Sequence, residues 1–167
     1  MKTSTMLENS NLLVIQAVDG LTETAWDVPG ACGEWSVKDI IAHLASYEHV
    51  IVDVLNTFLG SEPTPYVLRW IKQPAEFNKT EVEARRYQTA QHVEDEYQDM
   101  QVQATSLLQQ IPEKTIQQTG TMPWYKPDDC LADFIDMVYK HTQEHCEQIK
   151  SFRESGRAEM GGGSPTT

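Results

Sequence analysis

Histidine is the residue type in this chain whose spacing points most directly to chemistry. The five histidines are at positions 43, 49, 92, 141 and 145. On helices wound at about 100° per residue, His141 and His145 lie one turn apart on an apolar stripe, so both rings can reach a common point. His43 lies on the inward flank of another predicted helix, whereas His49 and His92 point to solvent. Three inward imidazoles would form a metal site with coordination positions left open for water or substrate, which is typical of catalytic sites.

A second interpretation stays open, in which the inward histidines belong to a buried hydrogen-bond network. With this number of histidines, a pair at spacing four arises by chance in roughly one sequence in eight. Three inward histidines indicate more than one would, because each buried ring nitrogen needs a partner. Nitrogen ligands suit zinc, nickel or iron, and the sequence does not choose among these metals.

Other reactive side chains have weaker patterns. Glu48 could serve as a general base, but its position favours a solvated helix carboxylate. Arg86 falls on an apolar helical stripe and could hold a substrate carboxylate, although an ion pair is the simpler interpretation. We expect Cys146 to be a small buried side chain rather than a nucleophile or a fourth ligand. Trp35 and Trp124 lie in aromatic loops, which either border a site or only cover the ends of the helices.

Four amphipathic stretches must position these residues. The predicted helices cover residues 5–20, 36–60, 80–111 and 128–156. Ser36 with Asp39, and Thr80 with Glu83, have the capping-box pattern at the start of the second and third helices. Helices of these lengths predict an all-α four-helix bundle. We expect one domain over residues 1–154, followed by a disordered low-complexity tail over residues 155–167.

The composition restricts the classes of partner. The 167 residues include 13 Lys+Arg and 25 Asp+Glu, which gives a net charge of -12 at pH 7. A chain this acidic repels phosphate backbones and anionic membranes, so we expect no nucleic acid and no membrane as partners. No apolar run is long enough for a membrane span, and the first residues make a poor signal peptide. Three cysteines without metal-site spacing fit a reducing cytoplasm better than a disulfide framework.

Two segments carry a family resemblance. The segment Gly33-Glu34-Trp35-Ser36-Val37-Lys38-Asp39-Ile40-Ile41-Ala42-His43-Leu44 resembles the start of the second helix in the DinB/YfiT-like superfamily. In that family a Trp and a Ser or Thr precede a helix with a metal-binding histidine, which here would be His43. The family's other two ligands lie one turn apart on the fourth helix, and His141-Thr142-Gln143-Glu144-His145 is similar to that arrangement.

The resemblance implies an up-down-down-up four-helix bundle with a divalent metal between the second and fourth helices. Related proteins include mycothiol-dependent maleylpyruvate isomerase-type domains and bacillithiol transferase-like proteins. It therefore implies a metal-dependent enzyme for small molecules, a thiol S-transferase or a hydrolase, with a low-molecular-weight thiol as co-substrate. The alternative is a non-catalytic metal- or small-ligand-binding module for stress or detoxification. Homodimer formation is left open.

The position of the metal and its access can also be predicted. His43 lies only two turns into its helix, so we expect the metal near one end of the bundle. Its open positions should face a cleft near Trp35 and the loops that hold Trp70, Trp124 and Tyr125. We expect Trp35, Arg86 and Trp124 to contact the substrate.

Overall fold

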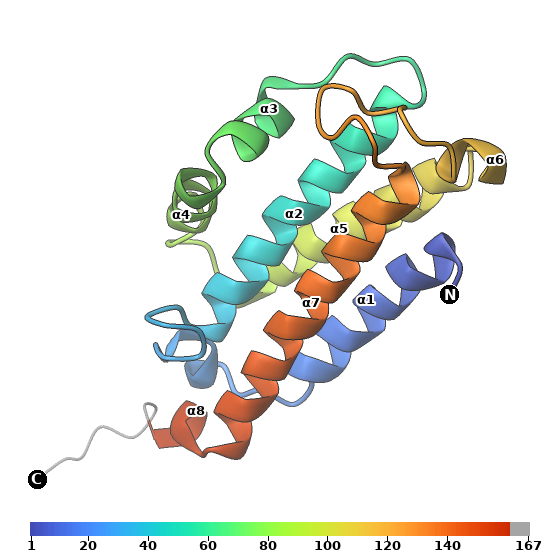
Figure 1. The fold of residues 1–167 in the computed structure, drawn as a ribbon. Coiled ribbons are helices and arrows are strands. Elements are labelled where there is room, and N and C mark those ends of the chain that lie inside the picture. Colours follow the sequence, from blue (N-terminus) through green and yellow to red (C-terminus); the bar gives the residue numbers. More distant parts are fainter. Residues whose placement is uncertain (161–167) are drawn as a thin grey trace, which may run out of the picture.

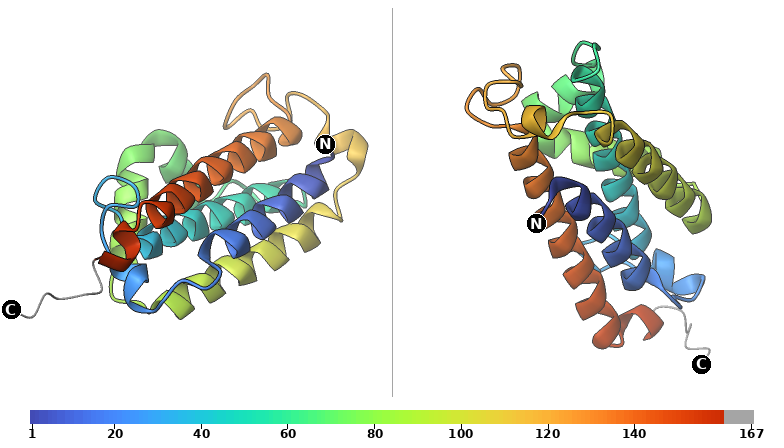
Figure 2. Two further views of the ribbon diagram at one scale, coloured as in Figure 1. Left: turned by 90° about the horizontal axis from the view of Figure 1, so that it is seen from below. Right: turned by 90° about the vertical axis from the view of Figure 1, so that its right-hand side faces the viewer.

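Four long helices form the body of the molecule (Figure 1). In the computed structural model, which describes residues 1–160, they are α1 (Thr3–Val18), α2 (Val37–Thr57), α5 (Ala90–Leu108) and α7 (Leu131–Glu154). Helix α1 packs along α7 in parallel, α2 packs along α5 in parallel, and the two pairs run in opposite directions (Figure 2). No β-strand forms within residues 1–160. The prediction of an all-α, up-down-down-up four-helix bundle is therefore confirmed.

Five short helices connect and cover this bundle. They are η1 (Thr24–Asp27), α3 (Pro65–Lys72), α4 (Pro74–Ala84), α6 (Glu113–Ile116) and α8 (Arg157–Met160). Helices α3 and α4 lie against α2, whereas α8 packs against η1 and α7. None of the helices in the described part of the chain is long and apolar enough to cross a membrane.

The chain stays folded beyond the expected end of the domain at residue 154. Residues 157–160, which we expected to belong to the tail, form α8, and Ala158 is buried. The rest of the predicted tail, residues 161–167, lies outside the described residues.

Helix α2 begins where the capping pattern predicts. The hydroxyl of Ser36 accepts a hydrogen bond from the backbone N–H of Asp39, at 3.1 Å, and the Asp39 carboxylate accepts one from the N–H of Ser36, at 3.0 Å. These two bonds satisfy N–H groups that a helix start otherwise leaves unpaired. Helices α3, α4, α5 and α7 all pack against α2, so most of its side chains are buried. Helix α2 is therefore the central helix, and His43 lies inside the molecule.

The helix predicted over residues 80–111 is in fact two helices. Helix α4 already begins before Thr80, so the pattern that starts there marks no helix start. A turn ends α4, and α5 then begins at a cap formed by Thr89, whose hydroxyl accepts a hydrogen bond from a backbone N–H in the first turn. The periodicity did not reveal the break because each helix has apolar residues at helical spacing. Read along the sequence, the two sets look like one continuous stripe.

A buried arginine at this turn corrects a second prediction. Arg85 donates hydrogen bonds to the Glu96 carboxylate on α5, at 2.7 Å, and to the carbonyl oxygen of Glu81 on α4, at 2.9 Å. Its neighbour Arg86, which we expected to point inward, is exposed and pairs with Glu83 at 2.7 Å. Because the chain turns between α4 and α5, the side chains there do not point where one continuous helix would place them. Arg85 is therefore buried, and Arg86 is not.

A polar layer divides the hydrophobic core into two clusters. One cluster contains Leu55 and Phe134, and the other contains Ile40 and Phe152. Where the clusters meet along α2, α5 and α7, the buried side chains are polar: His43, Glu48, Gln101, Thr142 and His145. Burying polar groups costs stability unless they find partners. This layer is therefore the part of the core where a function is expected.

Candidate metal centre

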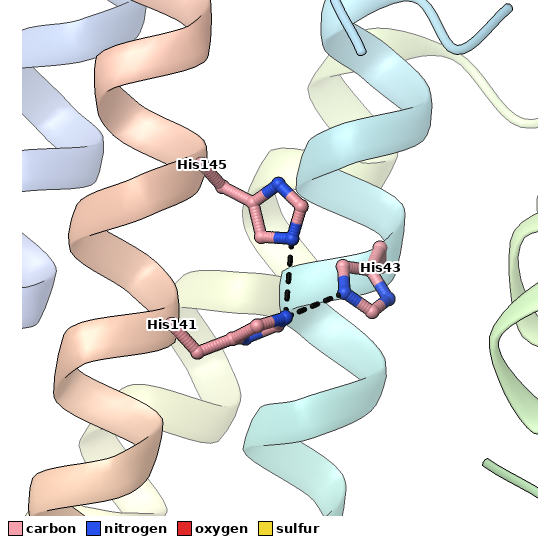
Figure 3. Close-up of side chains that lie close together, drawn as sticks. All are labelled: His43, His141 and His145. Atoms are coloured by element: carbon pink, nitrogen blue, oxygen red, sulfur yellow. Dashed lines mark hydrogen bonds between the residues drawn. The ribbon is translucent and has the colours of Figure 1, made fainter. Parts of the chain in front are cut away.

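Three histidine rings meet in the polar layer (Figure 3). His43 comes from α2, and His141 and His145 lie one turn apart on α7. The Nε2 atom of His141 lies 3.0 Å from Nε2 of His43 and 3.1 Å from Nε2 of His145. One ligand atom from each ring lies within 4.8 Å of the others, so the cluster could hold a metal ion. The structure thus brings together the three histidines that the sequence singles out.

The N–H groups of the three rings cannot turn both of these Nε2–Nε2 contacts into hydrogen bonds. Nδ1 of His145 donates a hydrogen bond to Oε1 of Gln148, at 2.8 Å, which leaves the lone pair of its Nε2 facing the cluster. Nε2 of His141 lies against two other nitrogens, and a neutral imidazole carries a single N–H. No placement of that hydrogen turns both contacts into full hydrogen bonds. A cation that accepts all three lone pairs removes the conflict, so the residues present fit a metal.

Burial keeps the rings in the neutral form that binds metals. Desolvation, with a smaller contribution from the neighbouring histidines, lowers the pKa of His43 to about 2. Desolvation and the charge of His145 lower the pKa of His141 to about 4, and burial also lowers the pKa of His145. Metal binding requires deprotonated ligands, so no proton has to be displaced from these rings at neutral pH.

Aromatic rings, not hydrogen bonds, hold two of the three imidazoles. Nδ1 of His43 and Nδ1 of His141 have no hydrogen-bond partner among residues 1–160. The Trp35 ring lies 5.0 Å from His43, and the Tyr47 ring stacks on His141 at 4.4 Å with an interplanar angle of 19°. Tyr47 also lies 4.7 Å from His43. Tyr47 was not predicted as a site residue, although its position one turn after His43 was a signal that it could contact the same site.

The site lies farther into the bundle than we expected. His141 and His145 lie near the middle of α7, where the two core clusters meet, and not near a bundle end. The prediction relied on the position of His43 near the start of α2. Helix α7, however, continues for several turns on both sides of His141 and His145. His141 is half-buried and is the most accessible of the three ligands.

The predicted substrate residues fall into two places. Trp35 and Arg86 line one cleft of about 670 Å³, between the start of α2 and α4. Trp124 lies in the loop before α7, where it contacts Tyr125. From there a series of ring contacts leads through Tyr125 and Trp70 to Tyr47, so Trp124 does not touch the histidines.

Glu48 is not the solvated carboxylate that we predicted. It is 2% exposed, and its Oε1 accepts a hydrogen bond from Gln101 on α5, at 3.1 Å. Burial raises the pKa of Glu48 to about 8, so the carboxyl group is mostly protonated at neutral pH. Helical phase had placed Glu48 on the edge of the apolar stripe, and packing against α5 covers that edge.

The other histidines and Cys146 lie outside the cluster of three histidines. His92 is exposed as predicted, but His49 is half-buried, with its Nε2 3.8 Å from the Glu96 carboxylate. Cys146 is a small buried side chain, as predicted, and burial raises the pKa of its thiol to about 12. Within residues 1–160 the cluster that could hold a metal contains three histidines and no cysteine or carboxylate. The described cysteines and carboxylates therefore supply no fourth ligand.

Comparison with protein families agrees with the resemblance seen in the sequence. The family model described as the DinB superfamily matches residues 7–149. The same comparisons found no match among curated proteins or solved structures. The family match includes all three histidines and spans most of the chain, from α1 into the second half of α7. The protein therefore belongs to the DinB superfamily.

Proposed function

We propose that the chain binds one divalent metal ion through Nε2 of His43, His141 and His145 and acts on a small molecule there. The observation that carries this proposal is the convergence of three imidazole nitrogens. Their N–H groups cannot turn all of the contacts between them into hydrogen bonds. Zinc, nickel and iron are the candidates for such a nitrogen set. The metal would supply a Lewis acid, or lower the pKa of a coordinated water or thiol towards neutrality.

The protein's own contribution is to hold the rings and to leave one side open. Trp35 and Tyr47 restrict the orientation of His43 and His141, and Gln148 does the same for His145. Three protein ligands leave coordination positions for water or substrate. The buried aromatic surroundings exclude water, which strengthens electrostatic interactions at the centre.

The cleft beside Trp35 is the proposed binding place for the organic part of the substrate. Its volume of about 670 Å³ falls within the range of pockets for small molecules. Trp35 both lines this cleft and contacts His43, so a molecule in the cleft lies one indole ring away from the centre. Arg86 lines the same cleft and could exchange its exposed ion pair with Glu83 for a substrate carboxylate.

The proposed reaction is transfer of a low-molecular-weight thiol to a small electrophile, or hydrolysis of a small substrate. Membership of the DinB superfamily supports this class, together with a histidine cluster to which no described cysteine or carboxylate adds a fourth ligand.

One observation favours a second candidate function, a module that binds a metal or small ligand without turnover. Catalysis needs a group that removes a proton near the reacting atom. No carboxylate of the described part of the chain belongs to the cluster, and the Glu48 carboxyl group is hydrogen-bonded to Gln101 on α5. Turnover would therefore have to rely on a metal-bound group or on the substrate itself for proton transfer.

Metal titration tests the shared part of both functions. Tag-free protein is stripped with a chelator and titrated with Zn²⁺, Ni²⁺ or, without oxygen, Fe²⁺ in a calorimeter. We expect one equivalent to bind, with at least a hundredfold weaker binding in His43→Ala, His141→Ala and His145→Ala. His92→Ala is the control, because His92 is exposed at the start of α5. Binding that is equally strong in all four variants would exclude the proposed site.

Chelator-driven metal loss then separates the two functions. Loss is measured with and without cysteine or glutathione, and thiol consumption is measured with a small chloro-aromatic electrophile. A transferase should show protection by thiol and turnover, whereas a binding module should show protection alone. Arg86→Ala should raise KM for a carboxylate-bearing electrophile and leave metal affinity unchanged. If no thiol slows metal loss, the transferase proposal fails, and a panel of small esters and amides tests the hydrolase.

A further inference from the structure

A second group of buried polar side chains lies between α2 and α5, whereas the histidines lie between α2 and α7. It consists of Glu48 from α2 and of Tyr97 and Gln101 from α5, which are 2%, 0% and 3% exposed. The amide of Gln101 donates a hydrogen bond to Oε1 of Glu48, at 3.1 Å. Tyr97 lies one turn before Gln101, so the two side chains share a face of α5. This group is independent of the metal centre and poses a separate question.

Two atoms of this group have nothing to bond to. Oε2 of Glu48 and the phenolic oxygen of Tyr97 are buried and find no hydrogen-bond partner among residues 1–160. Burial raises the pKa of Tyr97 well above its usual range, and a charge on Glu48 adds to this rise, which indicates that the two side chains are neighbours. Buried polar atoms without partners cost stability, so a further polar group is expected between them.

We propose that one internal water molecule binds between Oε2 of Glu48 and the phenolic oxygen of Tyr97. The protonated carboxyl group and the phenol each donate a hydrogen bond to this water, and the water donates one to the amide oxygen of Gln101. About three hydrogen bonds are typical of internal water. A neutral ligand suits the site better than a cation, because burial keeps the Glu48 carboxyl group protonated. The water thus joins α2 to α5 in the layer where the two core clusters meet.

The groove between α1 and α5 gives this water a route to solvent. The groove has a volume of about 440 Å³, and its lining includes Gln101 from α5 and Asn11 from α1. Oδ1 of Asn11 is buried and has no partner in the described part of the chain, so the groove is polar beside Gln101. None of the residues that line this groove also lines the cleft beside Trp35. Water therefore reaches Glu48 from a different side than a substrate in that cleft.

Oxygen-17 relaxation dispersion of the solvent tests the site, because it counts water molecules that stay inside the protein while it tumbles. We expect the wild type to hold about one such water more than the double variant Glu48→Met/Tyr97→Phe. Tyr87→Phe is the control, because Tyr87 is 96% exposed, and it should match the wild type. All samples are kept metal-free with a chelator, so the result does not depend on the proposed metal site. Equal signals from the wild type and the double variant would overturn the proposal.

A double-mutant cycle in urea gives a second readout. At pH 6 Tyr97→Phe should raise the equilibrium constant for unfolding about tenfold in the wild-type chain, because the water loses a partner. In a Glu48→Met background the same substitution should raise the constant at most about twofold, because the shared water is already lost. Effects of the two substitutions that simply multiply would contradict a water shared by both side chains.

The route is tested by narrowing the groove. Thr105 lines it one turn after Gln101, so Thr105→Trp should lengthen the residence time of the internal water several-fold. Glu83→Trp is the matched control, because Glu83 lines the cleft beside Trp35 and the residence time should not change. Equal residence times in these two variants would overturn the proposed route.

Discussion

Replacing Glu48 with glutamine should change the pH dependence of stability. The carboxyl group is 2% exposed, its Oε1 accepts one hydrogen bond from Gln101, and its Oε2 has no partner among the described side chains. Burial raises its pKa from 4.5 to about 8 in the folded protein. Between these pH values the folded chain therefore holds a proton at Glu48 that the unfolded chain releases.

The size of the effect follows from this difference. Where the folded state binds more protons than the unfolded state, the free energy of unfolding falls as the pH rises. The contribution of the protonated Glu48 to the free energy of unfolding is fully present below about pH 4.5. It is lost progressively up to about pH 8, at close to 1.4 kcal/mol per pH unit. Between pH 5 and pH 7 the free energy of unfolding of the wild type should fall by about 3 kcal/mol because of Glu48, and Glu48→Gln should not show this fall.

Urea unfolding at several pH values measures this effect. Both proteins are kept metal-free with a chelator, so that any contribution of the histidines cancels in the difference between them. We expect Glu48→Gln to equal the wild type near pH 5 and to exceed it by about 3 kcal/mol at pH 7. Glu144→Gln, on the exposed face of α7, is the control and should show no such trend. A difference between Glu48→Gln and wild type that stays within about 0.5 kcal/mol at every pH would refute the burial argument.

Three further outcomes are expected. Arg85→Ala should destabilise the fold by about 3–5 kcal/mol in urea unfolding, because it leaves the partly buried Glu96 carboxylate without its arginine and leaves Glu81 with Arg69 as its remaining arginine, whereas Arg86→Ala should cost less than about 0.5 kcal/mol. Tyr47→Leu should weaken metal binding about tenfold in calorimetry, because it removes the ring stacked on His141, and Tyr47→Phe should not. Ser36→Ala should cost about 1 kcal/mol of stability in thermal or urea unfolding, because it removes the cap of α2. Equal effects within either matched pair, or a neutral Ser36→Ala, would contradict the corresponding contacts.

The sequence by itself determined the features that depend on local geometry. The apolar stripes predicted the long helices but not the break between α4 and α5, and the start of α2 at Ser36 is confirmed by its capping bonds. The phase of a helix is fixed by its own backbone, so His141 and His145 had to share one face of α7. The resemblance to the DinB superfamily rested on short segments of this kind, and the family match confirms it.

Tertiary structure decided which flanks are covered and which side chains meet. Glu48 is buried because α5 packs on its side of α2, and Arg85, not Arg86, is buried because the chain turns between α4 and α5. Tyr47 lies against His141 only because α2 and α7 run side by side at that level. Helical periodicity describes directions around one axis, whereas burial and contact depend on segments far apart in the chain. For that reason the sequence predicted where the histidines point, and only the packed structure revealed what surrounds them.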